Sequence, residues 1–238
     1  MRTRRWSGEP FLRKDASTIR ETSGMGVEAK KKMRQGSWYQ RVVAHVIATD
    51  VANYNAMVRD RKQALISGLH GKIVEFGMGA GANLSFFAPD VQWLGVDPNP
   101  AMFPYVEQEA QRLGMAVEIH EGKAESLPVE SDSVDAVVCT TVLCTVRDPR
   151  QSLQEVLRVL KPGGRFVFIE HVAAPRRTWL RRQQNLVHFV WRLYADGCCP
   201  NRETWALIEN AGFSQVKIEH FRLKLGFLGP HIAGFAVK

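Results

Sequence analysis

The feature that most constrains the fold is an alternation of short apolar runs with helical stretches, which starts near residue 72. Apolar runs occupy residues 72–76, 93–97, 117–120, 134–138 and 165–169. Between some of them, residues 102–113 and 153–160 repeat apolar side chains at helical spacing. Strands that alternate with helices predict βαβ units, and therefore a parallel sheet with right-handed crossovers.

The end of the chain departs from this alternation. Residues 216–218 and 232–237 each have the pattern of a strand, and no clear helix lies between them. Such a pair predicts an antiparallel hairpin at one edge of the sheet. A nicotinamide-binding Rossmann domain has no need of this hairpin. The predicted fold is an α/β, Rossmann-like, mostly parallel sheet whose last strand is antiparallel, with helices on both faces.

A glycine-rich loop follows the first apolar run. Gly77, Gly79 and Ala82 fit the dinucleotide-binding pattern G-x-G-x-x-G/A, so the glycines alone do not identify a cofactor. Glycine permits a tight turn after a strand and a close approach of the ligand to the backbone. Gly81 adds a third alternate glycine and opens the loop further than a pyrophosphate requires.

Two acidic residues favour a cationic cofactor over a pyrophosphate-containing dinucleotide. Glu75 ends the first strand, where a carboxylate would repel a pyrophosphate and attract a cationic amino-acid tail. Asp97 lies 20 residues after Gly77, at the end of the second strand, where it can accept both ribose hydroxyls. S-adenosylmethionine carries an ammonium and a sulfonium but no phosphate. We therefore predict this cofactor, with a nicotinamide oxidoreductase as an alternative.

The loop at residues 122–128 follows the third strand and can offer a backbone N–H and a side-chain acceptor to adenine. It could equally be a polar loop without a ligand. The residues predicted to bind the cofactor are Glu75, Gly77, Gly79, Gly81, Asp97, Pro98, Asn99, Ala124, Glu125, Cys139 and Thr140.

With these residues in place, the chain resembles the class I S-adenosylmethionine-dependent methyltransferases from Ile73 to its C-terminus. The matching segments are VEFGMGAG, GVDPNP, AESLP, SVDAVVCTTVLC and RVLKPGG. The resemblance implies a seven-stranded sheet whose last strand is antiparallel.

The second half of the chain is similar to a narrower group, the methyltransferase-like protein seven family of thiol methyltransferases and its plant and microbial relatives. The similarity rests on Cys139-Thr140, Leu143-Cys144, residues 170–174, residues 196–198 and residues 230–234. It implies methyl transfer to small thiols or other small lipophilic acceptors. Animal members have an N-terminal hydrophobic anchor, whereas this chain begins with a basic polar segment.

Methyl transfer is an in-line displacement, so alignment and exclusion of water can supply much of the catalysis. A thiol acceptor needs little help, whereas an oxygen or nitrogen acceptor can need a base. Because strands four and five end near the methyl group in this family, His171 is the first candidate base. Asp196 and His231 are further candidates, and all three could instead hold loops. A quinone-type ring-carbon acceptor and a catalytically silent cofactor-binding module are the alternative functions.

The four cysteines form no CxxC pair and show no zinc-binding spacing. We therefore expect no metal and a reducing compartment. A minor alternative is that the adjacent Cys198 and Cys199 bind a soft metal ion or arsenic(III).

Positive charge is concentrated at the start of the chain. Residues 1–40 contain ten Lys or Arg and four Asp or Glu, whereas the rest contains 22 and 20. A nearly neutral body argues against a nucleic-acid partner. We predict a disordered segment at 1–36, which could also be an organellar transit peptide; otherwise the protein would be cytoplasmic. The methyltransferase domain would span 37–238, with residues 37–70 as a helical cover.

Residues 179–194 have the spacing of an amphipathic helix, with arginines nearby. We expect this helix to pack over the sheet and to line part of the acceptor pocket. A lid or a basic face that touches an anionic membrane is the alternative. No stretch is long and apolar enough to predict a transmembrane helix.

Overall fold

The computed structural model describes residues 38–238, with the backbone alone for residues 39–52. The predictions for residues 1–36, namely disorder and a transit peptide, lie outside this range.

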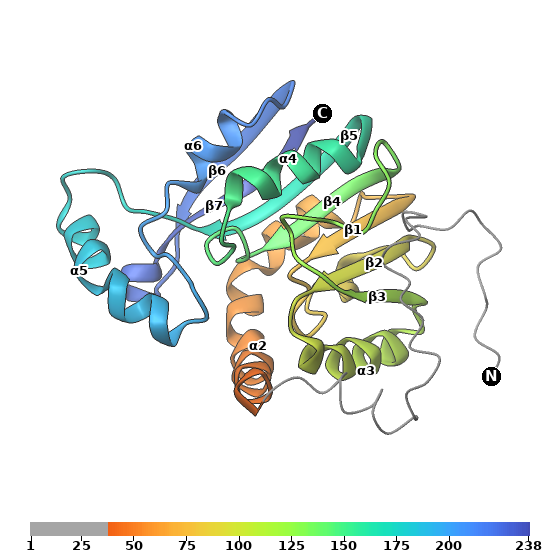
Figure 1. Ribbon diagram of the computed structural model, residues 1–238, viewed down its shortest axis with the longest axis horizontal. Coiled ribbons are helices and arrows are strands. Elements are labelled where there is room, and N and C mark those ends of the chain that lie inside the picture. Colours follow the sequence, from red (N-terminus) through yellow and green to blue (C-terminus); the bar gives the residue numbers. More distant parts are fainter. Residues whose placement is uncertain (1–37) are drawn as a thin grey trace.

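A seven-stranded sheet forms the centre of the molecule (Figure 1). Its strands are β1 (Lys72–Phe76), β2 (Gln92–Asp97), β3 (Val117–Glu121), β4 (Val134–Thr140), β5 (Leu160–His171), β6 (Gln215–Arg222) and β7 (Pro230–Val237). Their order across the sheet is β3-β2-β1-β4-β5-β7-β6. The first five strands are parallel, and β7 is antiparallel to both of its neighbours. The predicted fold is confirmed, including its antiparallel last strand.

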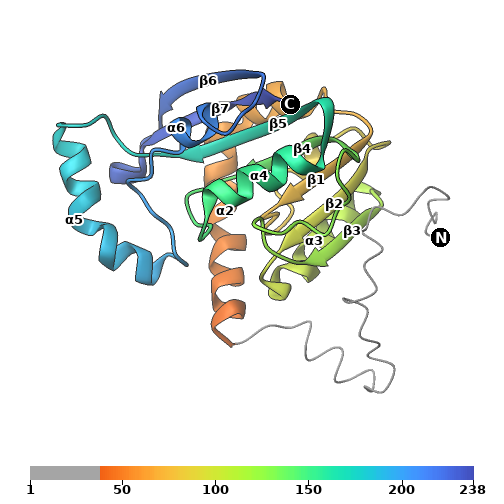
Figure 2. The same cartoon turned by 45° about the horizontal axis from the view of Figure 1, so that its top comes forward.

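Helices cover both faces of the sheet (Figures 1 and 2). They are α2 (Trp38–Ile66), α3 (Phe103–Leu113), α4 (Pro149–Val159) and α6 (Thr204–Glu209). On one face, α4 and α6 pack on the apolar side chains of β1, β4 and β5, with Phe166 at the centre. On the other face, α3 and the end of α2 pack around Trp93 and Val138. Strands buried on both faces explain the continuous apolar runs in the sequence.

Two local features differ from the predicted pattern. Among the described residues, no α-helix follows β1: the glycine loop leads into a single 3-10 turn, η1 (Leu84–Phe86), and then to β2. Closely spaced glycines disfavour a helix in so short a connection. Residues 161–164, which separate the helical stretch at 153–160 from the apolar run at 165–169 in the sequence, already belong to β5. A register shift between Val134 and Ala136 accommodates them.

The helix at 179–194, α5 (Trp179–Tyr194), forms as predicted but does not pack over the sheet. It lies beyond the end of the sheet, against the 3-10 turn η3 (Gly226–Leu228) (Figures 1 and 2). Gln184 is its one buried residue, and most of its large apolar side chains are exposed, although Trp191 packs against Phe227. The expectation of core packing is therefore wrong. Within residues 38–238, no helix has the length and apolar character needed to cross a membrane.

Candidate active site

The strand order reverses between β1 and β4, and the predicted cofactor residues gather at the carboxyl ends of these strands. Glu75 and Gly77 lie at the end of β1, Asp97 ends β2 and Thr140 ends β4. In open α/β sheets, ligands bind in the crevice outside the carboxyl ends at such a reversal. The topology therefore brings together groups that lie as far as 65 residues apart in sequence.

The three alternate glycines of the loop all adopt the left-handed backbone conformation. Their φ angles are +66° for Gly77, +51° for Gly79 and +78° for Gly81. A Cβ atom on Gly77 would also lie 2.4 Å from a methyl carbon of Val142, in the turn after β4. This loop therefore needs glycine both for its backbone angles and for its close packing against the next strand.

Glu75 is a fully buried carboxylate in a neutral polar cage. Its oxygens accept hydrogen bonds from Nδ2 of Asn83 at 2.9 Å and Nε1 of Trp93 at 3.1 Å. Burial raises the pKa of Glu75 to about 7, although both hydrogen bonds and the charge of Lys62 oppose that shift. A cation placed here would stabilise the ionised carboxylate.

Asp97 links the end of β2 to the glycine loop. Its two oxygens accept hydrogen bonds from the main-chain N–H of Asn99 at 2.8 Å and of Gly79 at 3.2 Å. Burial raises the pKa of Asp97 to about 6. Each carboxylate oxygen can accept a further hydrogen bond, so this group suits a pair of hydroxyls.

Two polar side chains of this region were not predicted from the sequence. Lys62 projects from α2, is almost fully buried, and donates to Oδ1 of Asn55 at 2.6 Å. Burial lowers its pKa to about 8, while the nearby charge of Glu75 raises it. Asn83 bridges Glu75 and Thr140, and its Oδ1 has no hydrogen-bond partner among the described residues. A lysine on a helix gives no sequence signal for such a position, since most are solvated.

Other predicted cofactor residues lie near this edge with different contacts. Ala124 is buried beside the loop, whereas the carboxylate of Glu125 accepts from the main-chain N–H groups of Arg147 and Asp148. Pro98 is exposed, and the side chain of Asn99 caps the turn η2 (Pro100–Met102).

Cys139 and Thr140 are neighbours on β4, and their side chains point to opposite faces. The hydroxyl of Thr140 accepts from Nδ2 of Asn83, which also donates to Glu75. The Cys139 thiol donates to Glu170 at 3.5 Å, and burial raises its pKa well above the usual range.

Glu170 holds the turn that follows β4. One oxygen accepts from the N–H groups of Val142 at 2.8 Å and Leu143 at 3.0 Å, and the other accepts from Cys144 at 3.3 Å. It is fully buried, and burial raises its pKa. Its lone pairs serve the backbone, so Glu170 is a structural carboxylate here.

The three candidate catalytic residues do not form one group. His171 and His231 are direct partners across β5 and β7, with ring centroids 6.2 Å apart. Nδ1 of His231 lies 2.9 Å from the Gly229 carbonyl, and burial lowers the His231 pKa to about 4. Asp196 is exposed and has a φ of +49°, and its charge acts on Asp97.

His171 instead has sulfur neighbours. Its Nε2 lies 3.1 Å from Sγ of Cys198, while its Nδ1 has no hydrogen-bond partner among the described residues. A hydrogen bond from Cys144 lowers the pKa of Cys198 to about 4, and the same bond raises the pKa of Cys144. The hydroxyl of Tyr54, on α2, is another buried group near this edge for which the described residues provide no partner.

Comparison with known proteins decides the class. A family described as a methyltransferase domain matches residues 74–168. The chain is 38% identical to the human thiol S-methyltransferase TMT1A, over 78% of this chain and 81% of the relative. It is 37% identical to human TMT1B, over 82% and 85% of the two chains. The chain belongs to this family of class I S-adenosylmethionine-dependent methyltransferases.

A solved structure, that of the YcgJ protein of Bacillus subtilis, has the same fold. Its TM-score is 0.57 over 77% of this chain and 96% of that chain, at 21% sequence identity.

As a member of this methyltransferase family, the protein is an enzyme whose cofactor is S-adenosylmethionine. The nicotinamide oxidoreductase and the silent binding module are therefore set aside. The residues present fit this cofactor. Glu75 is a buried acid without a full counter-charge, and Oδ1 of Asn83 beside it lacks a partner within the described part of the chain. An ammonium group supplies both a positive charge and N–H donors.

Proposed function

We propose that this enzyme methylates a small thiol. The observation that carries the proposal is the engagement of Glu170, the buried carboxylate at the ends of β4 and β5. Its oxygens accept from three main-chain N–H groups, so it is not free to act as a base. A thiol acceptor does not need that base, because its thiolate is appreciably populated near neutral pH. The thiol S-methyltransferases TMT1A and TMT1B support the same acceptor class.

For the cofactor we propose a division of labour among the residues of β1, β2 and α2. Glu75 and Oδ1 of Asn83 would hold the ammonium group, and Lys62 would pair with the carboxylate of the same amino-acid tail. Asp97 would accept the ribose hydroxyls, with the loop at 122–128 beside adenine. When bound, S-adenosylmethionine supplies an electrophilic methyl group on a positively charged sulfur. The glycine loop and the turn at Val142 would shield that centre from water.

Of the three candidate catalytic residues, we retain His171. His231 has a pKa of about 4, so it is a weak base, and Asp196 acts on Asp97 from an exposed position. His171 is buried at the end of β5, with the sulfur atom of Cys198 beside its ring. Its Nε2 faces that sulfur, whereas its Nδ1 has no hydrogen-bond partner among the described residues.

An acceptor screen tests this function. The full chain is incubated with methyl-labelled S-adenosylmethionine and alkyl thiols, aryl thiols, phenols or a demethylated quinol. We expect label in the thiol products, with one S-adenosylhomocysteine formed for each methyl group transferred. Label in the quinol, with no label in alkyl or aryl thiols, would favour the ring-carbon acceptor and overturn the proposal.

We further propose that α5 touches a membrane surface. Leu186, Phe189 and Trp179 are 83%, 73% and 72% exposed. Arg182 and Arg192 on the same helix are exposed as well. Apolar side chains beside arginines suit an interface with anionic lipid, where the rings enter the headgroup region and the cations remain near the phosphates.

Flotation with lipid vesicles tests this surface. Wild-type protein should float with vesicles that contain phosphatidylserine and less with neutral vesicles. The pair Leu186→Ser and Phe189→Ser should abolish flotation, whereas Gln183→Ser with Asn185→Ser on the same helix should not. Self-association that depends on α5, without flotation, would assign the surface to a second copy of the chain instead.

For the compartment we propose the cytoplasm, or an organelle if residues 1–36 act as a transit peptide. The four free cysteines are compatible with either reducing interior. A fluorescent fusion of the full chain, compared with one that begins at residue 37, separates the two. Identical diffuse distributions favour the cytoplasm, and organellar signal only in the full chain favours transit.

A further inference from the structure

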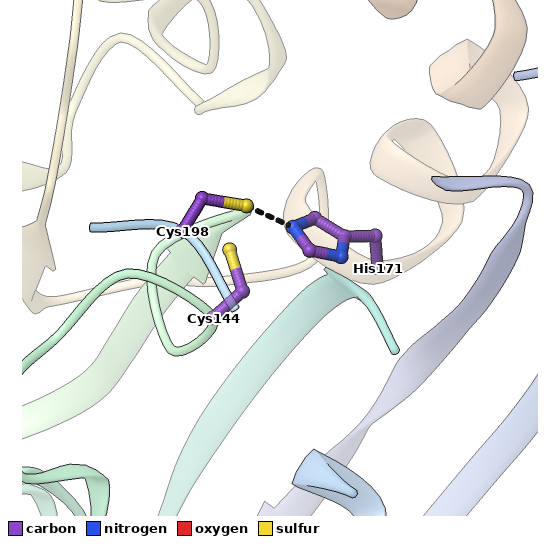
Figure 3. A group of neighbouring side chains, drawn as sticks. All are labelled: Cys144, His171 and Cys198. Atoms are coloured by element: carbon purple, nitrogen blue, oxygen red, sulfur yellow. Dashed lines mark hydrogen bonds between the residues drawn. The ribbon is translucent and has the colours of Figure 1, made fainter. Parts of the chain in front are cut away.

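Three side chains with ligand atoms suited to soft metals converge near the carboxyl ends of β4 and β5 (Figure 3). Cys144 lies in the turn after β4, His171 ends β5, and Cys198 lies in the loop after α5. Their Sγ and ring-nitrogen atoms all lie within 4.8 Å of one another. All three residues are buried, with exposures of 1%, 6% and 8%.

The loop that carries Cys198 is held in place by several contacts. The N–H of Cys199 donates to the carbonyl of Cys144 at 2.9 Å, which joins the two cysteine segments. Nε1 of Trp191 donates to Sγ of Cys198 at 3.2 Å. Asp196 and Gly197, with φ angles of +49° and +86°, form the tight turn before it. The three ligand atoms are therefore brought together by the fold and do not depend on an ion to assemble.

We propose that Cys144, His171 and Cys198 bind one thiophilic divalent ion, with zinc as its ordinary occupant. Two thiolates and an imidazole are a ligand set that zinc accepts, and three protein ligands leave the fourth tetrahedral position open. At bond lengths of about 2.3 Å to sulfur and 2.0–2.1 Å to nitrogen, such ligand atoms lie roughly 3.5–3.8 Å apart. The Nε2–Sγ contact of 3.1 Å would lengthen by about half an ångström on binding.

The open position gives the ion a role in the proposed thiol methylation, on which this part of the inference rests. An acceptor thiol that binds there loses its proton to solvent and remains a nucleophile at neutral pH. Its sulfur forms a bond to the methyl carbon while the bond from that carbon to the sulfonium breaks. The electron pair of the broken bond stays on the departing sulfur, and the charge of the ion does not change. His171 then serves as a ligand through Nε2.

Cys199 provides a matched control because it adjoins Cys198 but points elsewhere. Its Sγ lies 3.5 Å from the carbonyl of Gly197 and 3.5 Å from Nη2 of Arg202. The structure therefore pairs Cys198 with Cys144, and not with its neighbour in sequence.

The test is metal binding by the full chain after reduction and removal of metal. Zinc is titrated against a chromophoric chelator, and cobalt is added in parallel to detect a sulfur-to-cobalt charge-transfer band. We expect one equivalent of zinc and a thiolate band. Cys144→Ser and Cys198→Ser should each weaken zinc binding at least tenfold and reduce the band, while Cys199→Ser should match the wild type. Thermal unfolding and cofactor calorimetry verify that each variant is folded.

The results separate the ion from the acceptor. No zinc binding by the wild type, or an equal loss in Cys199→Ser, would overturn the site. Zinc binding without methylation of any thiol would support the site and reject the thiol acceptor. Thiol methylation that is unchanged after removal of the metal would support the acceptor and reject the role of the ion.

Discussion

The buried Glu75 carboxylate lowers the stability of the ligand-free protein when it is ionised. Its pKa of about 7, against an ordinary value of 4.5, means that the folded state binds a proton more tightly than the unfolded chain. Stability therefore falls as pH rises between those two values. We expect Glu75→Gln to stabilise the ligand-free enzyme by about 1–2 kcal/mol at pH 7.5, after the loss of one hydrogen bond. Calorimetric unfolding measures this change.

The same substitution should weaken cofactor binding at least tenfold, because the ammonium group loses its counter-charge. Glu118→Gln, at a half-exposed carboxylate on β3, is the control and should change neither property. A Glu75→Gln enzyme with lower stability and unchanged affinity would contradict this account.

The pH dependence of cofactor affinity follows from the same two acids. As pH falls from 8 to 6, Glu75 takes up a proton first and Asp97 begins to follow, since their pKa values are about 7 and 6. Affinity should therefore fall with decreasing pH, by at most about tenfold per pH unit for each group. Calorimetric titrations across this range measure the slope. In Glu75→Gln the slope between pH 7.5 and 6.5, below the Lys62 pKa of about 8, should be much smaller; an unchanged slope would assign it to another group.

Among single residues, the sequence predicted the site residues at strand ends. It missed the residues that reach the site from other elements of the folded chain. Glu75 and Asp97 could be placed because a strand end fixes where a side chain lies. Lys62 could not, since nothing in a helical pattern tells which lysine will be buried. Cys144 and Cys198 each lie 27 positions from His171 in the sequence, so no short motif indicates that the three side chains meet.

The glycine loop depends on left-handed φ angles and on the lack of room for a Cβ atom. Gly77 and Gly163 have similar φ angles of +66° and +78°, but only at Gly77 would a Cβ meet another side chain. We expect Gly163→Ala to cost roughly 1–2 kcal/mol from the left-handed conformation alone. Gly77→Ala should cost more, because Val142 must move, and should abolish detectable cofactor binding. Chemical denaturation and calorimetry compare the two, and equal costs would show that the contact with Val142 is unimportant.

Gln184 makes three of the hydrogen bonds that attach α5 to the rest of the protein. Oε1 of Gln184 accepts from the N–H of Ala174 at 2.7 Å, and its Nε2 donates to the carbonyls of Val172 at 3.1 Å and Phe227 at 2.9 Å. Gln184→Ala leaves these groups without a partner, at a cost of about 1–3 kcal/mol.

We therefore expect faster hydrogen exchange across residues 179–194 in Gln184→Ala, with the sheet unchanged. Gln183→Ala, at the exposed neighbouring position, should exchange like the wild type. Equal exchange in both variants would mean that α5 is held mainly by the contact between Trp191 and Phe227.

The spacing of apolar residues predicted where helices and strands form better than it predicted what each of them packs against. The spacing of apolar residues in 179–194 correctly indicated a helix, but an apolar face says only that something can cover it. The alternation of strands and helices is also incomplete: the connection between β1 and β2 holds the glycine loop and the 3-10 turn η1, and no α-helix. Alternation along β4 would have separated Cys139 from Thr140, because adjacent strand residues point to opposite faces.

For the molecule as a whole, the two edges of the sheet differ in character. At the amino ends of the strands, a cavity of about 380 Å³ is lined partly by Asp135 and Lys161, which pair with each other at 2.6 Å. Those charges are satisfied there. At the carboxyl ends, Oδ1 of Asn83, Nδ1 of His171 and the hydroxyl of Tyr54 lack partners among residues 38–238. These are three of the five unpartnered buried side-chain atoms among the described residues, so the unsatisfied polar groups favour the second edge as the functional one.

A thermal-shift series tests this assignment on the intact enzyme. A ligand that binds only the folded state at a hundred times its Kd adds about 2.7 kcal/mol of stability. For a domain of this size, that corresponds to a rise in Tm of about 5–10 °C. We expect this rise with S-adenosylmethionine and S-adenosylhomocysteine, little change with NADH, and no rise for Asp97→Asn at the same concentration. Glu121→Gln, the exposed register partner of Asp97 on β3, should keep the wild-type response. Since the proposed cofactor site lies at the carboxyl ends of β1 and β2, away from Asp135, Asp135→Asn should lower the starting Tm and still show the full rise. A rise that depended on Asp135 and not on Asp97 would move the cofactor to the opposite edge of the sheet.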